Sequence, residues 1–224
     1  MPGVKLRRFG TIGALLAASL FVAVVPASAE PDAGTANLGS ALFKVGTKPQ
    51  VEIATQATCV VDDPSKATVT TGTVSKSGIS FGGGTSTCSR TVLDEANSVS
   101  SITAQTVGKP FDLSALVGLG GPRVHLNEYK ASCIGTQGRT SASWSFSGIS
   151  ALPGLPGQIQ SGYVYHLKNS KTGAELGTIT FGETATSNDG DGSLTMSALH
   201  IRFTAPEKVT GEVVLGTVAC GPTP

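Results

Sequence analysis

Apolar and polar residues alternate along several short segments of this chain. In the clearest one, residues 141–149, Ala142, Trp144, Phe146 and Gly148 share one parity and serines fill the other. Successive side chains of a strand point to opposite faces, so this pattern predicts a strand with the tryptophan in the core and a serine row facing water. Segments 67–70, 163–167 and 178–181 alternate in the same way, and in 163–167 we expect His166 to face outward.

Turn signals separate these segments. Gly- and Pro-rich stretches at 82–84, 118–122, 152–157 and 188–192 predict loops, and no window shows helical periodicity. Short strands between turns spaced roughly 8–12 residues apart indicate an all-β sandwich or barrel. We predict a single-domain antiparallel β-sandwich over residues 41–224, preceded by a flexible leader over 30–40.

Two predicted strands change phase along their length. In 193–203, Leu194, Met196 and Ala198 share a parity, whereas Leu199, Ile201 and Phe203 take the opposite one; 124–133 changes in the same way. Such a change indicates a β-bulge or a corner where the strand passes between sheets. The alternative is a strand buried on both faces. Residues 213–220 are apolar on both faces and suit a central strand.

The first 29 residues have the features of a cleaved secretory signal peptide. Lys5, Arg7 and Arg8 precede an apolar run over 12–25, and Ala27-Ser28-Ala29 forms a small-residue cleavage site. The alternative is a membrane anchor, but the run is shorter than the roughly 20 residues that a span requires. The sequence leaves open whether export follows the general secretory or the twin-arginine route.

Charge and cysteine content refine this picture. The 224 residues carry 16 Lys and Arg against 15 Asp and Glu. Loss of Lys5, Arg7 and Arg8 with the signal peptide leaves a net charge of −2, which argues against a nucleic-acid partner. All four cysteines follow the cleavage site, and an even number in an exported chain predicts two disulfides. Of the three possible connectivities we favour Cys59–Cys88 with Cys133–Cys220.

Residues that could carry catalysis or bind metal are scattered. Residues 78–82 match G-x-S-x-G, but Gly83 and Gly84 follow, where a nucleophile elbow requires a helix. His125, His166 and His200 lie on predicted polar faces without metal-ligand spacing. Residues 188–192 offer oxygen ligands for calcium, although a hairpin turn is the stronger interpretation. Single carboxylates at Glu128, Glu175, Glu183 and Glu212 do not define a glycosidase pair. We therefore predict no enzyme activity, cofactor or metal.

The widespread surface feature is a set of Ser- and Thr-rich strand faces. These faces either recognise polysaccharide of the bacterial wall or simply keep a weakly charged surface soluble. We expect a non-catalytic structural or binding protein whose partner is cell-wall polysaccharide or another secreted protein. A secreted protease inhibitor or other protein-binding module, presenting an exposed loop over 152–157, is the first alternative. An unrecognised extracellular hydrolase is the second.

The segments 192–201 and 211–220, together with Val124-His125-Leu126-Asn127-Glu128, resemble the choice-of-anchor P family of secreted, β-rich actinobacterial proteins. The resemblance implies extracellular or cell-surface residence and no catalytic residues. The chain ends at Gly221-Pro222-Thr223-Pro224 without a sortase motif. We therefore expect release from the cell or non-covalent association with the wall.

Overall fold

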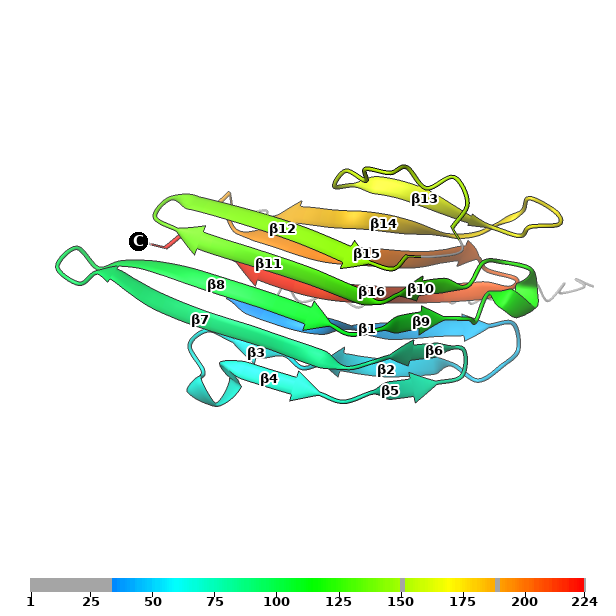
Figure 1. Cartoon of the computed structure of the whole chain (residues 1–224), viewed down its shortest axis with the longest axis horizontal. Coiled ribbons are helices and arrows are strands. Elements are labelled where there is room, and N and C mark those ends of the chain that lie inside the picture. Colours follow the sequence, from blue (N-terminus) through cyan, green and yellow to red (C-terminus); the bar gives the residue numbers. More distant parts are fainter. Residues whose placement is uncertain (1–33, 150–151, 188–189, 224) are drawn as a thin grey trace, which may run out of the picture.

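Two layers of antiparallel strands pack face to face in this protein (Figure 1). The computed structural model describes residues 34–149, 152–187 and 190–223. Within these ranges the helical segments are two short 3-10 turns, η1 (Pro64–Lys66) and η2 (Val117–Leu119). The predicted all-β, disulfide-containing sandwich is confirmed. The signal peptide predicted over 1–29 lies outside the described residues.

One sheet forms the first layer. Its strands follow the order β13-β14-β15-β16-β1-β2, and β3 pairs with the start of β1. Their bounds are β1 (Thr35–Val45), β2 (Val51–Gln56), β3 (Cys59–Val60), β13 (Tyr163–Lys168), β14 (Glu175–Thr186), β15 (Leu194–Ala205) and β16 (Val209–Cys220). The doubly apolar segment 213–220 lies in β16, between β15 and β1, as predicted for a central strand.

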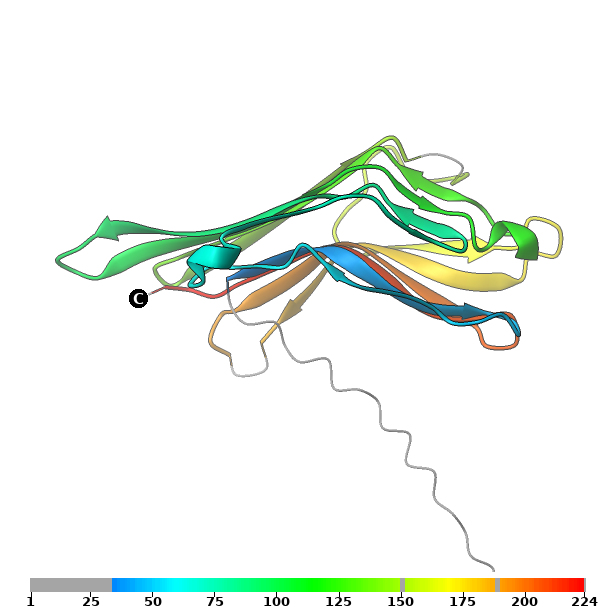
Figure 2. The same cartoon turned by 90° about the horizontal axis from the view of Figure 1, so that it is seen from below.

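The second layer consists of two sheets placed end to end. One has the order β12-β11-β8-β7-β4 and the other the order β10-β9-β6-β5. Their bounds are β4 (Thr68–Thr71), β5 (Val74–Lys76), β6 (Ile79–Phe81), β7 (Gly84–Asp94), β8 (Val99–Gly108), β9 (Phe111–Leu113), β10 (Val124–Leu126), β11 (Glu128–Thr136) and β12 (Arg139–Ser147). The chain passes from one sheet to the other four times, and the layer bends at this level (Figure 2).

These passages explain one of the two phase changes. In segment 124–133 the break falls at Asn127, between β10 and β11, so the predicted corner between sheets is confirmed. Neighbouring corners lie at Gly82-Gly83 and at Lys109-Pro110. Proline lacks the N–H that a continuous ladder requires, which favours a break at Pro110.

The other phase change lies within the first layer. In β15, Ala198 and Leu199 are both buried, and the neighbouring strands have Gly182 and Gly216 at the same level. Both glycines have a positive φ, 55° and 63°, which side-chain-bearing residues rarely adopt. The pairing register of β15 is the same on both sides of this level, so no residue is inserted. The regular pleat is therefore interrupted at neighbouring positions of β14, β15 and β16. The first layer changes direction there, near the position where the second layer bends.

The core fills the space between the layers. Tyr129 on β11 is its largest fully buried side chain and lies where the layers bend. A Cβ on Gly108 would lie 2.0 Å from the Tyr129 ring, and one on Gly216 would lie 3.3 Å from it. Small residues on both sides of the ring therefore make room for it.

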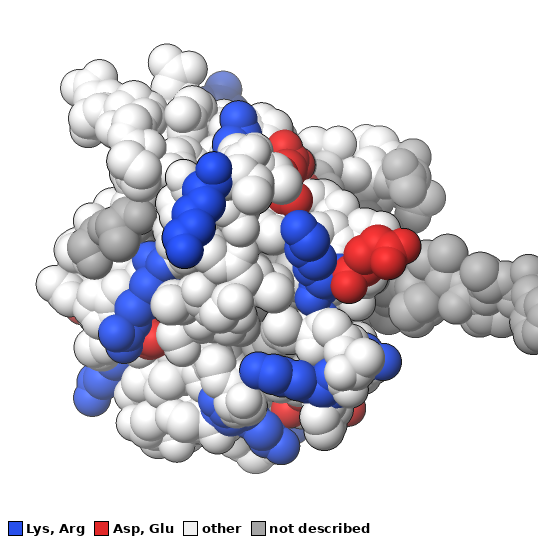
Figure 3. All heavy atoms as spheres, turned by 90° about the vertical axis from the view of Figure 1, so that its right-hand side faces the viewer, with Lys and Arg blue, Asp and Glu red and all other residues white. Residues whose placement is uncertain are grey.

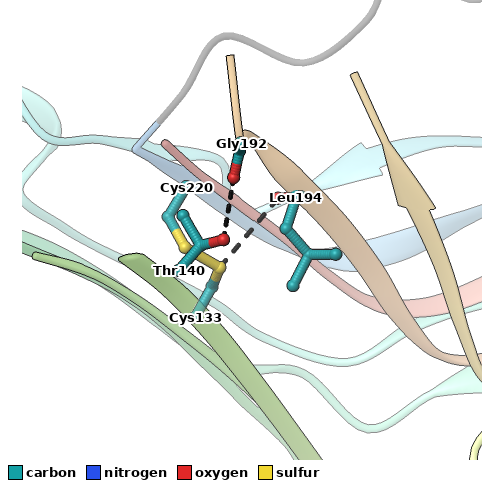
Figure 4. Close-up of a disulfide and its surroundings, with 5 residues drawn as sticks. All are labelled: Cys133, Thr140, Gly192, Leu194 and Cys220. Carbon is teal, nitrogen blue, oxygen red and sulfur yellow. Dashed lines mark hydrogen bonds between the residues drawn. A yellow bond between two sulfur atoms is a disulfide. The ribbon is translucent and has the colours of Figure 1, made fainter. Parts of the chain in front are cut away.

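Both disulfides connect one layer to the other. Cys59 on β3 is bonded to Cys88 on β7, and Cys133 on β11 to Cys220 on β16, with Cα separations of 5.6 and 5.8 Å. The favoured connectivity is confirmed. Beside the second disulfide, the Thr140 hydroxyl donates a 2.8 Å hydrogen bond to the carbonyl of Gly192 (Figure 4). The two disulfides therefore add covalent links between the two layers, which the hydrophobic core also holds together.

Two expectations about local structure need correction. The leader predicted over 30–40 is wrong for residues 35–40, which belong to β1, because Ala36 and Leu38 face the core and their backbone pairs with β16. Trp144 faces inward as predicted but is only half-buried, since β12 is an edge strand of its layer. The segment between β12 and β13 lies against this edge and contributes the buried Leu152.

Candidate binding surface

The Ser- and Thr-rich strand faces predicted from the sequence come together on the outer side of the second layer. The strand register aligns one residue from each of five strands in a row across the sheet. Adjacent rows on either side have the same character. The rows are Ser143-Ser132-Gln105-Thr87-Thr68, Ser145-Lys130-Val107-Thr85-Thr70 and Ser141-Ile134-Thr103-Ser89. We call this surface the hydroxyl face.

The hydroxyl face is broad and almost uncharged. At about 4.8 Å between strands and about 6.7 Å between alternate residues, its side chains span about 19 Å by 13 Å. Its single charged residue, Lys130, forms a 2.9 Å ion pair with Glu128, which neutralises it. Apart from the apolar Val107 and Ile134, the face is a regular array of side chains that form hydrogen bonds, most of which both donate and accept.

This surface has no built-in preference for an ionic ligand, and its side chains are short. Ser and Thr lose little rotamer entropy when a ligand fixes them, and the sheet already fixes their spacing. Such an array matches a ligand that presents many hydroxyl groups at regular intervals. The sequence predicted the individual serine and threonine rows, but their alignment depends on which strands are neighbours.

The three histidines lie on three different strands, and each is paired with a carboxylate. His125 on β10 lies 3.4 Å from Asp112, and His166 on β13 lies 2.7 Å from Glu175. His200 on β15 contacts Glu183 through Nδ1 at 2.6 Å and Glu212 through Nε2 at 2.9 Å. Among the described residues, no group of His, Cys, Asp and Glu has an arrangement that could hold a metal ion.

The ion pairs around His200 form a network on the outer side of the first layer. Arg202 donates hydrogen bonds of 2.7 and 3.0 Å to the two oxygens of Glu183. Burial by itself would raise the pKa of Glu183, but the Arg202 hydrogen bonds and the positive charges of His200 and Arg202 outweigh it, so the pKa is lowered. All the acidic groups of this network are paired, which is typical of a stabilising surface network.

The remaining sequence candidates lie apart from one another. Ser80, in the G-x-S-x-G segment, lies within the short strand β6 and shares a 2.7 Å hydrogen bond with Ser75, so it does not occupy a strand-turn-helix elbow. Glu128 is paired with Lys130, and Glu175 with His166. Glu183 and Glu212 contact the two nitrogens of the His200 ring, so each of the four candidate glutamates is paired with a basic side chain.

Two predicted loops are described only in part. In the segment 188–192, Asn188 and Asp189 lie outside the described residues, while Asp191 accepts hydrogen bonds from the backbone and hydroxyl of Ser193. In the loop 152–157, Leu152 is buried and the Tyr165 hydroxyl donates to the carbonyl of Pro153. This loop packs on the β12 side of the sandwich, and the two disulfides lie elsewhere.

None of the helical segments in the described parts of the chain has the length and apolar character of a membrane span. Comparison of the sequence with protein-family models and with curated proteins, and of the structure with solved structures, finds no match to this chain.

Proposed function

We propose that this protein is an exported, non-catalytic binding module whose hydroxyl face attaches to a neutral polysaccharide of the cell envelope or its surroundings. The observation that carries the proposal is the alignment of mostly uncharged, hydrogen-bonding side chains in adjacent rows across four or five strands. Sugar hydroxyls, like those of Ser and Thr, both donate and accept, so the two surfaces are chemically complementary.

Export is part of the same proposal. Two disulfides indicate an oxidising compartment. The resemblance to choice-of-anchor P proteins and the signal-peptide features of the first 29 residues agree with that location. The face covers less area than a standard protein interface, so one module binds weakly and the repeating polymer compensates by offering many equivalent sites.

Co-sedimentation tests this function. The chain from Glu30 to Pro224 is mixed with washed cell walls, purified peptidoglycan, cellulose and chitin, and the protein in each pellet is measured. We expect retention on at least one of these polymers that persists in about 0.5 M salt, because an uncharged face makes few screened contacts. Recovery in the supernatant with all four would overturn the proposal.

A pair of matched variants locates the binding surface. Thr87→Arg and Ser143→Arg place a long charged side chain in the central row, at exposed positions of β7 and β12. Thr210→Arg makes the same change at an exposed strand position on β16, in the other layer. The first two should lose retention and the third should keep it. Equal behaviour of all three would assign the binding to another surface.

A further inference from the structure

A cavity of about 490 Å³ opens between the two layers at one end of the molecule. Turns β1–β2 and β5–β6 and the segment after β9 meet there, and their residues line it: Val45, Lys48, Val51, Lys76, Ala115 and Gly118. An adjoining cavity of about 350 Å³ shares Val45, Lys48, Ala115 and Gly118 and extends to Lys208 in turn β15–β16. The main cavity has the size of a small-molecule site.

The partly buried residues of the cavity lining are apolar except for Ser114. Val45, Val51 and Ala115 are partly buried and pack against the hydrophobic core. Val117 precedes the lining residue Gly118 in η2 and has 51% of its surface exposed, which makes it one of the most exposed large hydrophobic residues of the described chain. The cavity therefore leads from solvent to the core, and water in it contacts apolar surface whose burial is favourable.

The rim is positively charged. Lys48, Lys76 and Lys208 are exposed, and in the described part of the chain none of their ammonium groups has a carboxylate within 4.0 Å. Figure 3 faces this end and shows Lys and Arg side chains distributed over it. Glu207 is the acidic residue that lines the adjoining cavity, and none lines the main one.

The other end of the sandwich carries charges of both signs. Its acidic residues are Asp62 and Asp63 after β3, Asp94 at the end of β7 and Glu95 in the turn that follows. Asp62 and Asp63 form ion pairs with Arg90 and Lys66. Arg139 is also exposed at that end, so Lys48, Lys76 and Lys208 are distinguished by their position around the apolar cavity, next to which none of them has an ion-pair partner among the described residues.

We propose that this cavity binds a single anionic amphiphile, namely a carboxylate that carries a saturated acyl chain. The chain occupies the apolar space between the layers, and the carboxylate lies at the rim near Lys48 and Lys76. The cationic rim and the apolar lining together favour this ligand over a neutral or cationic amphiphile, because only an anionic head group gains charge-assisted contacts with the lysine ammonium groups. The site is separate from the hydroxyl face and does not depend on its function.

Calorimetric titration with decanoate, below the concentration at which it forms micelles, tests the proposal. We expect saturable binding at one molecule per chain and about tenfold weaker binding of octanoate, which has two fewer methylenes. Acetate, which lacks the chain, and decyltrimethylammonium, which reverses the charge, should bind negligibly. Equal binding of the cationic and anionic chains would overturn the proposal.

Substitutions separate this cavity from the rest of the surface. Gly118 lines the cavity and a Cβ on it meets nothing within 4 Å, so the backbone accepts a side chain there and we expect the ring in Gly118→Phe to obstruct the cavity and abolish binding. Gly157 is equally open and lines a different cavity beside Trp144, so Gly157→Phe is the matched control and should bind normally. Retained binding in Gly118→Phe, or loss in both variants, would contradict this site.

Charge reversal provides a second test that does not depend on filling the cavity. Lys48→Glu and Lys76→Glu should each weaken decanoate binding about tenfold, as expected for loss of a charge-assisted contact. Arg139→Glu makes the same change at the opposite end and should have no effect. Co-flotation with phosphatidylglycerol vesicles tests whether this end of the molecule binds a membrane surface instead. Vesicle binding without decanoate binding would assign this end to a membrane surface and overturn the proposal.

Discussion

The hydroxyl of Tyr129 on β11 donates a 3.0 Å hydrogen bond to the carbonyl oxygen of Leu38 on β1, and so joins the two layers where both change direction. Both residues are almost fully buried. Burial raises the pKa of Tyr129, so its hydroxyl remains a donor throughout the physiological range. The contact is one of two buried polar links in this part of the core, since Ser86 and Thr106 share a 3.0 Å hydrogen bond nearby.

Tyr129→Phe should destabilise the protein by about 1–3 kcal/mol, because the buried carbonyl of Leu38 loses its side-chain donor. Tyr165→Phe removes a similar hydrogen bond, to Pro153, at an exposed position where water can replace it. It should cost less than about 1 kcal/mol. Urea unfolding followed by tryptophan fluorescence measures the free energy of unfolding of both variants. Equal decreases would show that the buried hydrogen bond contributes no more to stability than the exposed one.

Gly182→Ala should destabilise the protein by about 2–4 kcal/mol and change the emission of Trp144. The new Cβ would lie 2.0 Å from Nε1 of Trp144, and φ is positive at this position. Gly173→Ala shares the positive φ but has open space around the Cβ, so it should cost about 1 kcal/mol and leave the emission unchanged. Equal losses in the two variants would mean that the indole moves aside freely.

The two disulfides should contribute unequally to stability. Their closed loops span 29 and 87 residues, which on the chain-entropy model correspond to about 3.6 and about 4.6 kcal/mol. Replacing both cysteines of the Cys133–Cys220 pair with alanine should therefore lower the free energy of unfolding by about 1 kcal/mol more than the same change at Cys59–Cys88. Denaturant unfolding of the two double variants measures the difference, and the reverse order would contradict this entropic account.

Glu183 should make the protein sensitive to acid. Its pKa is lowered in the folded state, so its stabilising contribution is present above the unfolded value of about 4.3 and is lost as the pH falls through the lowered folded value. Glu183→Gln should therefore be less stable than the parent at pH 7, and the gap should narrow at pH 3. Thermal unfolding across this range measures the gap.

Glu95→Gln is the matched control for the acid test. Glu95 is exposed and has no ion pair among the described residues, so its replacement should leave the pH dependence of stability unchanged. A gap between parent and Glu183→Gln that stays constant from pH 7 to pH 3 would show that the Arg202 contact does not depend on ionisation.

Local pattern predicted much of this fold, because strand faces follow from neighbouring residues. The alternation around Trp144, the apolar β16 and both disulfides were all accessible from the sequence. The start of β1 was missed because residues 35–40 are mostly small or polar, and they form a strand only when β16 supplies the pairing partner. Tertiary pairing there overrides weak local preference.

The candidate sites depend on information that alternation does not contain. Ser143 and Thr68 belong to one row only because β11, β8 and β7 lie between their strands. Likewise, Lys48 and Lys76 are separated by 28 positions in the sequence, and only the topology brings their turns to one cavity. The residue types predicted what kind of contact each site can form. Where the sites lie on the molecule follows only from the order of the strands.

Both crosslinks lie on the same side of the bend, in the half that contains β3, β7, β11 and the end of β16. The turns that surround the cavity lie in the opposite half, where packing and backbone hydrogen bonds, such as those from Gly46 to Lys208 and from Ala115 to Gly78, hold them without a disulfide. Surface turns generally accept changes in length and sequence. The molecule therefore combines a covalently crosslinked half with a half whose turns can change in length and sequence without disturbing either disulfide.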